Sequence, residues 1–265
     1  MPKIEVHIIL GLSTAILALA CTGDHGKETD RTSTMISWSL VDSFPHDVQA
    51  FTQGLVVADG KLFESTGGEN SWIAEVDLIS GMQHKKVELS NDYFGEGICV
   101  INRKMYQLTW KNQIGFIYDT NSFVKSGEFH FQTEGWGITN DQTHIFISNG
   151  TDKIFVLDTV LFECKDTIYV SENGKRVKML NELEFIDGYI YANQWQTNYV
   201  LKINPRSGNV EGKLDFSSLA TRVANLTSNA NVLNGIAYEP KSKILLITGK
   251  LWPILFAIKL SSNKP

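Results

Sequence analysis

The segment QGLVVADGKLFEST (residues 53–66) decides the fold, because the chain repeats its pattern four more times. A polar residue and a glycine are followed by a short apolar strand, a turn, and a second strand rich in large apolar residues. Each copy is therefore predicted to be a β-hairpin. The other copies, which begin with a polar residue or Trp, are EGICVINRKMYQLT (96–109), WGITNDQTHIFISN (136–149), NELEFIDGYIYANQ (181–194) and NGIAYEPKSKILLIT (234–248).

The spacing of these copies predicts the architecture. The aligned positions are 43, 40, 45 and 53 residues apart, and a second pair of strands follows most hairpins. Four strands at this period are typical of a β-propeller blade. The last copy ends one strand short, whereas ISWSLVDSFPH (36–46) is a strand without a partner in its own copy. We predict an all-β, five-bladed β-propeller with four antiparallel strands per blade, whose ring is closed by this N-terminal strand.

The N-terminal segment predicts export. Residues 8–20 form an apolar run of 13 residues, which suits a signal peptide and is short for a membrane-spanning helix. Cys21 follows a small residue, as in the signals of bacterial lipoproteins, so acylation of Cys21 and ordinary secretion both remain open. We assign residues 1–20 to the signal, 21–35 to a flexible tether and 36–265 to the propeller. The expected location is the cell envelope as a lipoprotein, or the periplasm or medium.

Composition excludes several classes of function. The 265 residues carry a net charge of −5 and no run of Lys or Arg, so nucleic acid is not an expected partner. Cys21, Cys99 and Cys164 supply neither a disulfide scaffold nor metal-ligand spacing, and the six histidines are scattered. We expect no metal or other cofactor, contact with a membrane only through a lipid anchor, and a monomer, since a closed ring leaves no edge strand to pair.

The repeat also predicts where a functional site lies. In a hairpin the start of one strand lies beside the end of its partner, so both sets of flanking residues belong to one mouth of the central channel. That mouth is expected to combine a carboxylate, an ammonium, amides and four or more indoles. Glu96 stands between two glycines and has little packing purpose, and a carboxylate in an aromatic pocket can transfer protons near neutral pH. The converging residues are Gln53, Glu96, Trp136, Asn181, Asn234, Trp110, Trp195, Lys250 and Trp252.

At these positions the sequence resembles the glutaminyl-peptide cyclotransferases of the plant and bacterial type. The matching strings include FTQGL (51–55), FGEGI (94–98), EGWGIT (134–139), YANQW (191–195) and ITGKLWP (247–253). The resemblance implies metal-independent conversion of the N-terminal glutamine of peptides or proteins to pyroglutamate with release of ammonia. It implies a catalytic set of Glu96, Lys250 and Asn181, with Glu96 as acid and base, and a substrate-binding set of Phe51, Gln53, Trp110, Trp136 and Trp195. Two departures from the family pattern are Gly68, in place of an aromatic residue, and Gln194, in place of an aliphatic one.

Two other classes of function remain open on the sequence. A non-catalytic propeller at the cell envelope would use the aromatic mouth to bind a peptide or a glycan, because fold alone does not imply activity. A purely structural envelope lipoprotein would tolerate any change at the mouth. The set of Glu96, Asn181 and Lys250 favours the enzyme, since a binding platform does not need a carboxylate between glycines beside a lysine.

Overall fold

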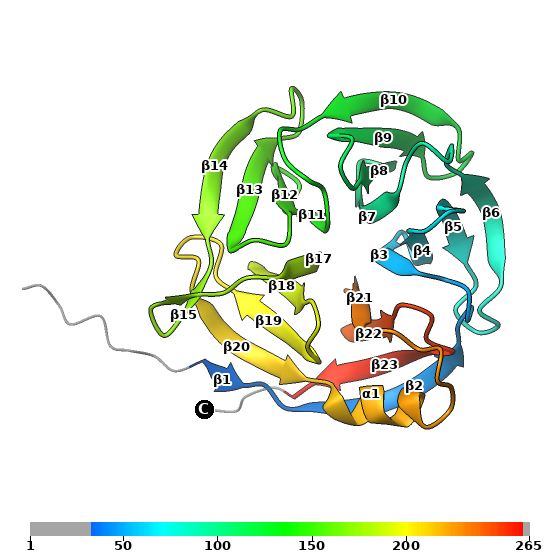
Figure 1. Ribbon diagram of the computed structural model, residues 1–265, viewed down its shortest axis with the longest axis vertical. Coiled ribbons are helices and arrows are strands. Elements are labelled where there is room, and N and C mark those ends of the chain that lie inside the picture. The colour runs from blue at the N-terminus through cyan, green and yellow to red at the C-terminus, as the bar shows by residue number, and fades with distance from the viewer. Residues whose placement is uncertain (1–32, 262–265) are drawn as a thin grey trace, which may run out of the picture. The chain divides into compact units, whose positions relative to one another are not determined.

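The computed structural model describes residues 33–261, which form five β-sheets arranged as blades around a common axis (Figure 1). Each blade is antiparallel, and its strands follow one another outward from the axis. Blade one contains β3 (Thr52–Ala58), β4 (Lys61–Thr66), β5 (Trp72–Val76) and β6 (Gln83–Glu88). Blade two contains β7 (Gly95–Ile101), β8 (Lys104–Thr109), β9 (Ile114–Asp119) and β10 (Lys125–His130). Blade three contains β11 (Ile138–Asn140), β12 (His144–Ser148), β13 (Lys153–Asp158) and β14 (Cys164–Tyr169).

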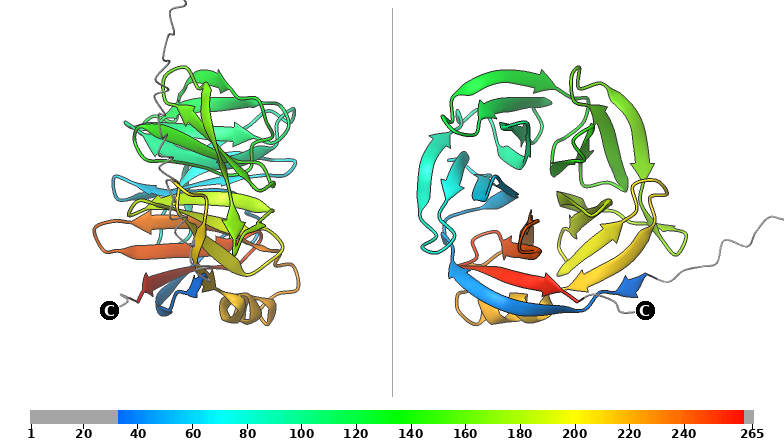
Figure 2. Two further views of the ribbon diagram at one scale, coloured as in Figure 1. Left: turned by 90° about the vertical axis from the view of Figure 1, so that its left-hand side faces the viewer. Right: turned by 180° about the vertical axis from the view of Figure 1, so that it is seen from behind.

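The remaining two blades complete the ring, as the view from behind also shows (Figure 2). Blade four contains β17 (Leu180–Ile186), β18 (Tyr189–Gln194), β19 (Tyr199–Ile203) and β20 (Val210–Asp215). Blade five contains β21 (Leu233–Glu239), β22 (Ile244–Gly249) and β23 (Ile254–Leu260), with β2 (Trp38–Pro45) as its outermost strand. The predicted five-bladed propeller is confirmed.

Closure of the ring joins two distant parts of the chain. β2 runs antiparallel to β23, with Trp38 opposite Leu260 and Pro45 opposite Ile254. The predicted role of the N-terminal strand is therefore confirmed. The short strand β1 (Thr34–Met35), at the end of the range assigned to the tether, pairs in parallel with β20 of blade four. The predicted signal peptide, Cys21 and the rest of the tether lie outside the described residues.

Two small elements depart from the repeat. The helix α1 (Ser217–Ala224) occupies the longest interval between copies, and its Leu219 and Val223 are buried in the hydrophobic cluster between blades four and five. The strands β15 (Ser171–Glu172) and β16 (Lys175–Arg176) form a two-stranded hairpin. The chain remains mostly strand, as predicted. Within residues 33–261, no helix is long and apolar enough to span a membrane.

The core consists of apolar clusters between neighbouring blades, and the inner strands approach closely at the axis. A Cβ atom on Gly54 would lie 2.4 Å from the Ile98 nitrogen, and one on Gly97 would lie 2.8 Å from the Ile138 nitrogen. Real side chains do not fit at such distances, so the repeated glycine marks the point where adjacent blades touch. This contact fixes the residue beside each glycine at the channel mouth.

The fourth copy carries Glu182 where the other copies carry glycine. Its buried carboxylate accepts hydrogen bonds from the Ile236 N–H at 2.9 Å and the Leu55 N–H at 3.4 Å. Glu182 lies on β17, and these donors lie on β21 and β3, so one carboxylate links three inner strands. Burial and the charge of Glu184 raise the pKa of Glu182 well above its usual range, against the lowering effect of the two N–H groups. Glu182, the one residue that replaces the repeated glycine, therefore links blade four to blades five and one near the axis.

Candidate active site

Irregular strand register directs polar side chains to the channel mouth. The pairing of the inner strand with its neighbour shifts at the start of β3, β7, β17 and β21. Gln53, Glu96, Asn181 and Asn234 lie at these irregularities. A β-bulge changes the direction of a side chain and ends regular pairing, which explains why a polar residue can stand before the aligned position, glycine in three of these copies and Glu182 in the fourth.

The ends of the second strands lie at the same mouth, as the sequence analysis predicts. The Trp110 N–H donates to the Phe94 carbonyl at 3.0 Å, and the Trp195 N–H donates to the Met179 carbonyl at 2.8 Å. Lys250, which follows β22, donates its N–H to the Val232 carbonyl at 3.0 Å. Each bond joins the residue after a second strand to the residue that immediately precedes the inner strand of the same blade.

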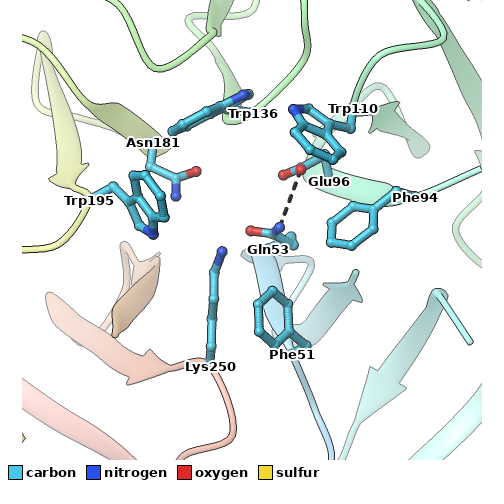
Figure 3. A pocket seen from close by; sticks show the side chains of 9 residues that line it. All are labelled: Phe51, Gln53, Phe94, Glu96, Trp110, Trp136, Asn181, Trp195 and Lys250. Carbon is cyan, nitrogen blue, oxygen red and sulfur yellow. Dashed lines mark hydrogen bonds between the residues drawn. The ribbon is translucent and has the colours of Figure 1, made fainter. Parts of the chain in front are cut away.

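A cavity of about 220 Å³ opens between these side chains (Figure 3). The structure brings together every residue that the sequence analysis assigned to catalysis or substrate binding. Asn234 is buried beneath the pocket, where its Nδ2 donates to the Thr52 carbonyl at 3.0 Å. Trp252 turns into the core and donates its indole N–H to the Asn231 carbonyl at 2.7 Å, so the expected fourth indole is absent from the pocket. The lining residues are Phe51, Gln53, Phe94, Glu96, Trp110, Trp136, Asn181, Trp195 and Lys250.

Glu96 is held by its backbone on both sides. The Gly95 N–H donates to Ser71 Oγ at 3.0 Å, and the Gly97 N–H donates to the Trp136 carbonyl at 2.9 Å. Glu96 is 4% exposed, and its Oε1 accepts a hydrogen bond of 3.2 Å from Gln53 Nε2. This arrangement fixes a nearly dry carboxylate at the pocket wall.

The electrostatics of the pocket are dominated by Glu96 and Lys250. Burial raises the pKa of Glu96 well above its usual range; the Lys250 ammonium opposes the rise, and the Glu134 carboxylate adds to it. Burial lowers the pKa of Lys250 to about 8, although Glu96 opposes that change. Burial therefore favours the neutral form of both groups more than it is favoured in exposed side chains.

The Lys250 ammonium points into the pocket and lies 4.6 Å from the centre of the Phe51 ring (Figure 3). Within residues 33–261 it makes neither a hydrogen bond nor an ion pair. A buried ammonium with this environment can act as a donor to oxygen on a bound molecule.

The side-chain amides of Gln53 and Asn181 differ in the number of hydrogen-bond partners that they have in the pocket. Gln53 is occupied on both sides, because it donates to Glu96 and accepts from Asn234 Nδ2 at 3.4 Å. Asn181 is 2% exposed, and in the described part of the chain its buried Oδ1 has no hydrogen-bond partner. A buried acceptor without a partner is costly, so Asn181 is suited to receive an N–H from a bound molecule.

Aromatic rings form the remaining walls. Trp136 and Trp195 meet edge to face with ring centres 5.6 Å apart, and Phe94 lies 5.7 Å from Trp110. A carboxylate that does not line the cavity, Glu134, accepts from the indole N–H of Trp110 at 3.0 Å and from that of Trp136 at 3.2 Å on the same oxygen, Oε2. One side chain thus fixes the orientation of two walls.

Phe94 and Glu134 are two residues of the site that were not predicted from the sequence. Phe94 stands two residues before Glu96, and Glu134 stands two residues before Trp136, so each lies inside a string that carries the resemblance. Their proximity to predicted residues was the available signal. Over residues 33–261, no three His, Cys, Asp or Glu side chains gather where they could hold a metal ion.

The chain is similar to known proteins over most of its length. Residues 12–260 match the family model described as glutamine cyclotransferase. A glutaminyl-peptide cyclotransferase from Arabidopsis thaliana is 37% identical over 240 residues, which cover 89% of this chain and 75% of that protein. The crystal structure of Myxococcus xanthus glutaminyl cyclase superposes with a TM-score of 0.82 at 34% identity, covering 86% of this chain and 98% of that one.

Proposed function

This chain belongs to the glutamine cyclotransferase family and is a glutaminyl cyclase, and from that premise we propose that Glu96 is its acid and base and that it needs no metal ion. One observation carries the proposal. A nearly dry carboxylate and an ammonium that makes no ion pair among the described residues face the same small aromatic pocket. The substrate is the N-terminal glutamine of a peptide or protein.

The proposed reaction needs one proton carrier. The α-amine nitrogen attacks the side-chain carboxamide carbon, a new C–N bond closes the five-membered ring, and Glu96 accepts a proton from the amine. Glu96 then donates a proton to the departing amide nitrogen, whose bond to carbon breaks to release ammonia. The carboxylate is regenerated, so the transfer is balanced. The raised pKa of Glu96 makes its protonated form easier to reach than that of an exposed carboxyl, which favours a group that must both accept and donate a proton.

Lys250 is the proposed stabiliser of the oxyanion. Negative charge develops on the carboxamide oxygen during attack, and an ammonium held in a dry site stabilises such charge strongly. Gln53 is less suited to this role, because its Nε2 is committed to Glu96. Asn181 Oδ1 accepts hydrogen bonds and is matched to an N–H of the substrate amine.

The aromatic walls select the reactive conformation. Attack within one residue is already intramolecular, so the remaining gain comes from holding the side chain folded towards its own amine. Trp110, Trp136 and Trp195 enclose a cavity of about 220 Å³, which favours a compact side chain over an extended one.

A mass-spectrometric time course tests the proposed function. The purified full-length protein is incubated with a peptide that begins with glutamine, with and without a chelator, beside a sample without enzyme. We expect loss of ammonia far above the spontaneous rate and unaffected by the chelator. Loss of activity in chelator that added metal restores would contradict metal independence, and no turnover by folded protein would contradict the activity.

Glu134 provides a prediction about the walls. Leucine at this position removes the acceptor for two indole N–H groups, and we expect KM to rise about tenfold, since each bond to a charged group contributes about 1.5–3 kcal/mol before solvent exposure is discounted. Glutamine keeps an acceptor oxygen, so Glu134→Gln should retain a KM close to that of the native enzyme. Steady-state kinetics on both variants measure the difference.

The pH profile separates these effects from loss of structure. The negative charge of Glu134 raises the pKa of Glu96, so Glu134→Gln should move the acid limb of kcat/KM to lower pH. A variant that was only destabilised would not shift this limb. Equal KM values in Glu134→Gln and Glu134→Leu would show that the indole hydrogen bonds do not support substrate binding.

A further inference from the structure

A second cavity, of about 570 Å³, opens beside the active-site pocket. We call it the blade-one groove, because its lining comes from β6, from Trp72 at the start of β5 and from the loops that flank β3 and β4 in blade one, together with Phe94. Phe51 and Phe94 line both cavities, with ring centres 6.3 Å apart in an edge-to-face contact. The polar lining of the groove consists of Asp47, Gln49, Glu69, Asn70, Lys86 and Glu88.

The boundary between the two cavities is firm. The Gly67 N–H donates to the Phe51 carbonyl at 2.9 Å, and a Cβ atom on Gly67 would lie 2.2 Å from the Phe94 ring, so this ring packs directly on the backbone. The next residue, Gly68, has a φ of +109°, and no atom lies within 4 Å of the position of a Cβ. The groove is thus open beside a rigid aromatic boundary, and Figure 3 shows both phenylalanines at the side of the pocket away from Trp136 and Trp195.

We propose that the blade-one groove binds the second and third residues of the peptide substrate and favours basic side chains there. This inference rests on the proposed function, because only an N-terminal glutamine held in the pocket places later residues at the groove. A pocket of about 220 Å³ accommodates little more than that glutamine, and an extended chain advances roughly 3.3–3.6 Å per residue. The second residue therefore lies on the Phe51–Phe94 pair, which forms the edge of the groove, and the third lies within the groove.

The charge of the groove sets the preference. Three carboxylates, those of Asp47, Glu69 and Glu88, face one ammonium, that of Lys86. Asp47 accepts from Gln83 Nε2 at 2.6 Å, and Glu88 lies 3.7 Å from Lys86. Glu69 is exposed and, among the described residues, has no hydrogen bond or ion pair, so its charge is available to a cation on the substrate.

The test compares peptides that differ only beside the glutamine. The full-length enzyme is given Gln-Lys-Lys-Ala amide, Gln-Ala-Ala-Ala amide, Gln-Glu-Glu-Ala amide and glutamine amide, which has no residue for the groove. We expect kcat/KM to fall in the order lysine, alanine, glutamate peptide. The ratio between lysine and glutamate peptides should be about tenfold at low ionic strength and should shrink at about 1 M salt, where screening acts within roughly 3 Å.

Charge reversal locates the effect. The double variant Glu69→Lys/Glu88→Lys should invert the order of the peptides and leave kcat/KM for glutamine amide unchanged. The matched control Glu163→Lys/Glu211→Lys makes the same change of charge on exposed residues of blades three and four, and it should keep the native order.

The outcomes separate the two proposals. Turnover of all four substrates with equal kcat/KM for the three peptides would overturn the proposed role of the groove and leave the cyclase activity intact. The groove is also overturned if the control variant inverts the order as fully as the groove variant, because net charge would then be the cause. No turnover of any substrate, glutamine amide included, would overturn the proposed function itself.

Discussion

Replacing Glu96 with glutamine is expected to lower kcat by about 10²–10⁴, the range over which a positioned acid and base accelerates proton transfer. Glutamine has nearly the same shape and can accept the hydrogen bond that Gln53 donates. It cannot accept the amine proton or return one to the leaving nitrogen. Single-turnover kinetics with a glutamine-initiated peptide measure the loss directly.

The same variant should be at least as stable as the native protein. The pKa of Glu96 is raised in the folded state, so its contribution to the free energy of unfolding is fully present below the unfolded pKa and is lost as pH rises through the folded pKa. Glutamine does not ionise, and the midpoint of thermal unfolding at pH 8 should therefore equal or exceed that of the native protein. The difference should disappear near pH 4, where both side chains are neutral.

Glu184→Gln is the matched control for this experiment. Glu184 is also buried, accepts from the Tyr238 N–H at 2.9 Å and has a pKa that burial raises to about 8, but it lines a different cavity. Its kcat should remain close to that of the native enzyme. Near-native turnover by Glu96→Gln, or an equal loss in both variants, would refute the assignment of Glu96.

Lys250→Met should lower kcat by about 10²–10³, the range seen when a donor to a developing oxyanion is removed. Methionine keeps much of the length and the apolar character of the side chain, so packing beside Phe51 should survive. The substitution removes the positively charged ammonium. Circular dichroism of the variant should match that of the native protein.

The pH dependence gives this variant a distinctive signature. The charged form of Lys250 is lost as pH rises through about 8, so kcat of the native enzyme should fall on the alkaline side at that pH. The alkaline limb should vanish in Lys250→Met. Because the ammonium also lowers the pKa of Glu96, its removal should move the acid limb to higher pH.

Lys111→Met serves as the control for Lys250. The Lys111 ammonium lies 3.9 Å from the centre of the Trp110 ring but does not line the cavity. An exposed cation–π contact contributes about 0.5–1 kcal/mol, so the change in kcat/KM should stay within roughly fivefold, with the alkaline limb of kcat unchanged. An alkaline limb that persists in Lys250→Met would show that another group is responsible for it.

The fold could be predicted from the repeat because the close approach of neighbouring inner strands requires a glycine at the same position of most copies. Glycine recurs where neighbouring inner strands touch, and one polar residue precedes it where the strand bulges, so spacing alone locates the blades and the mouth. The unpaired strand at residues 36–46 and the missing strand of the last copy identify the closure in the same way. The assignments of Glu96, Lys250 and Asn181 needed the resemblance as well, since hairpin geometry gives a face but no roles.

Other features of the site could not be predicted from the sequence, because they depend on contacts between residues that the spacing of the repeats does not specify. Trp252 falls at a mouth position in the pattern, but the turn after Lys250 directs its ring into the core. Glu134 stands in a loop, and only the fold reveals that its oxygen reaches two indoles from different blades. The blade-one groove combines β6 with the loops beside β3 and β4, which are separate in the sequence.

The pairing of β2 with β23 has a consequence for the timing of activity. Synthesis proceeds from the N-terminus, so Glu96 and the three indoles of the pocket exist well before Lys250, which immediately precedes the final strand of the fifth blade. In a nascent chain, Lys250 is therefore not held in the pocket until β23 has been synthesised and has paired with β2. A product that ends before β23 leaves β2 without its partner strand even when it contains Lys250, so its ring stays open and we expect it to be inactive.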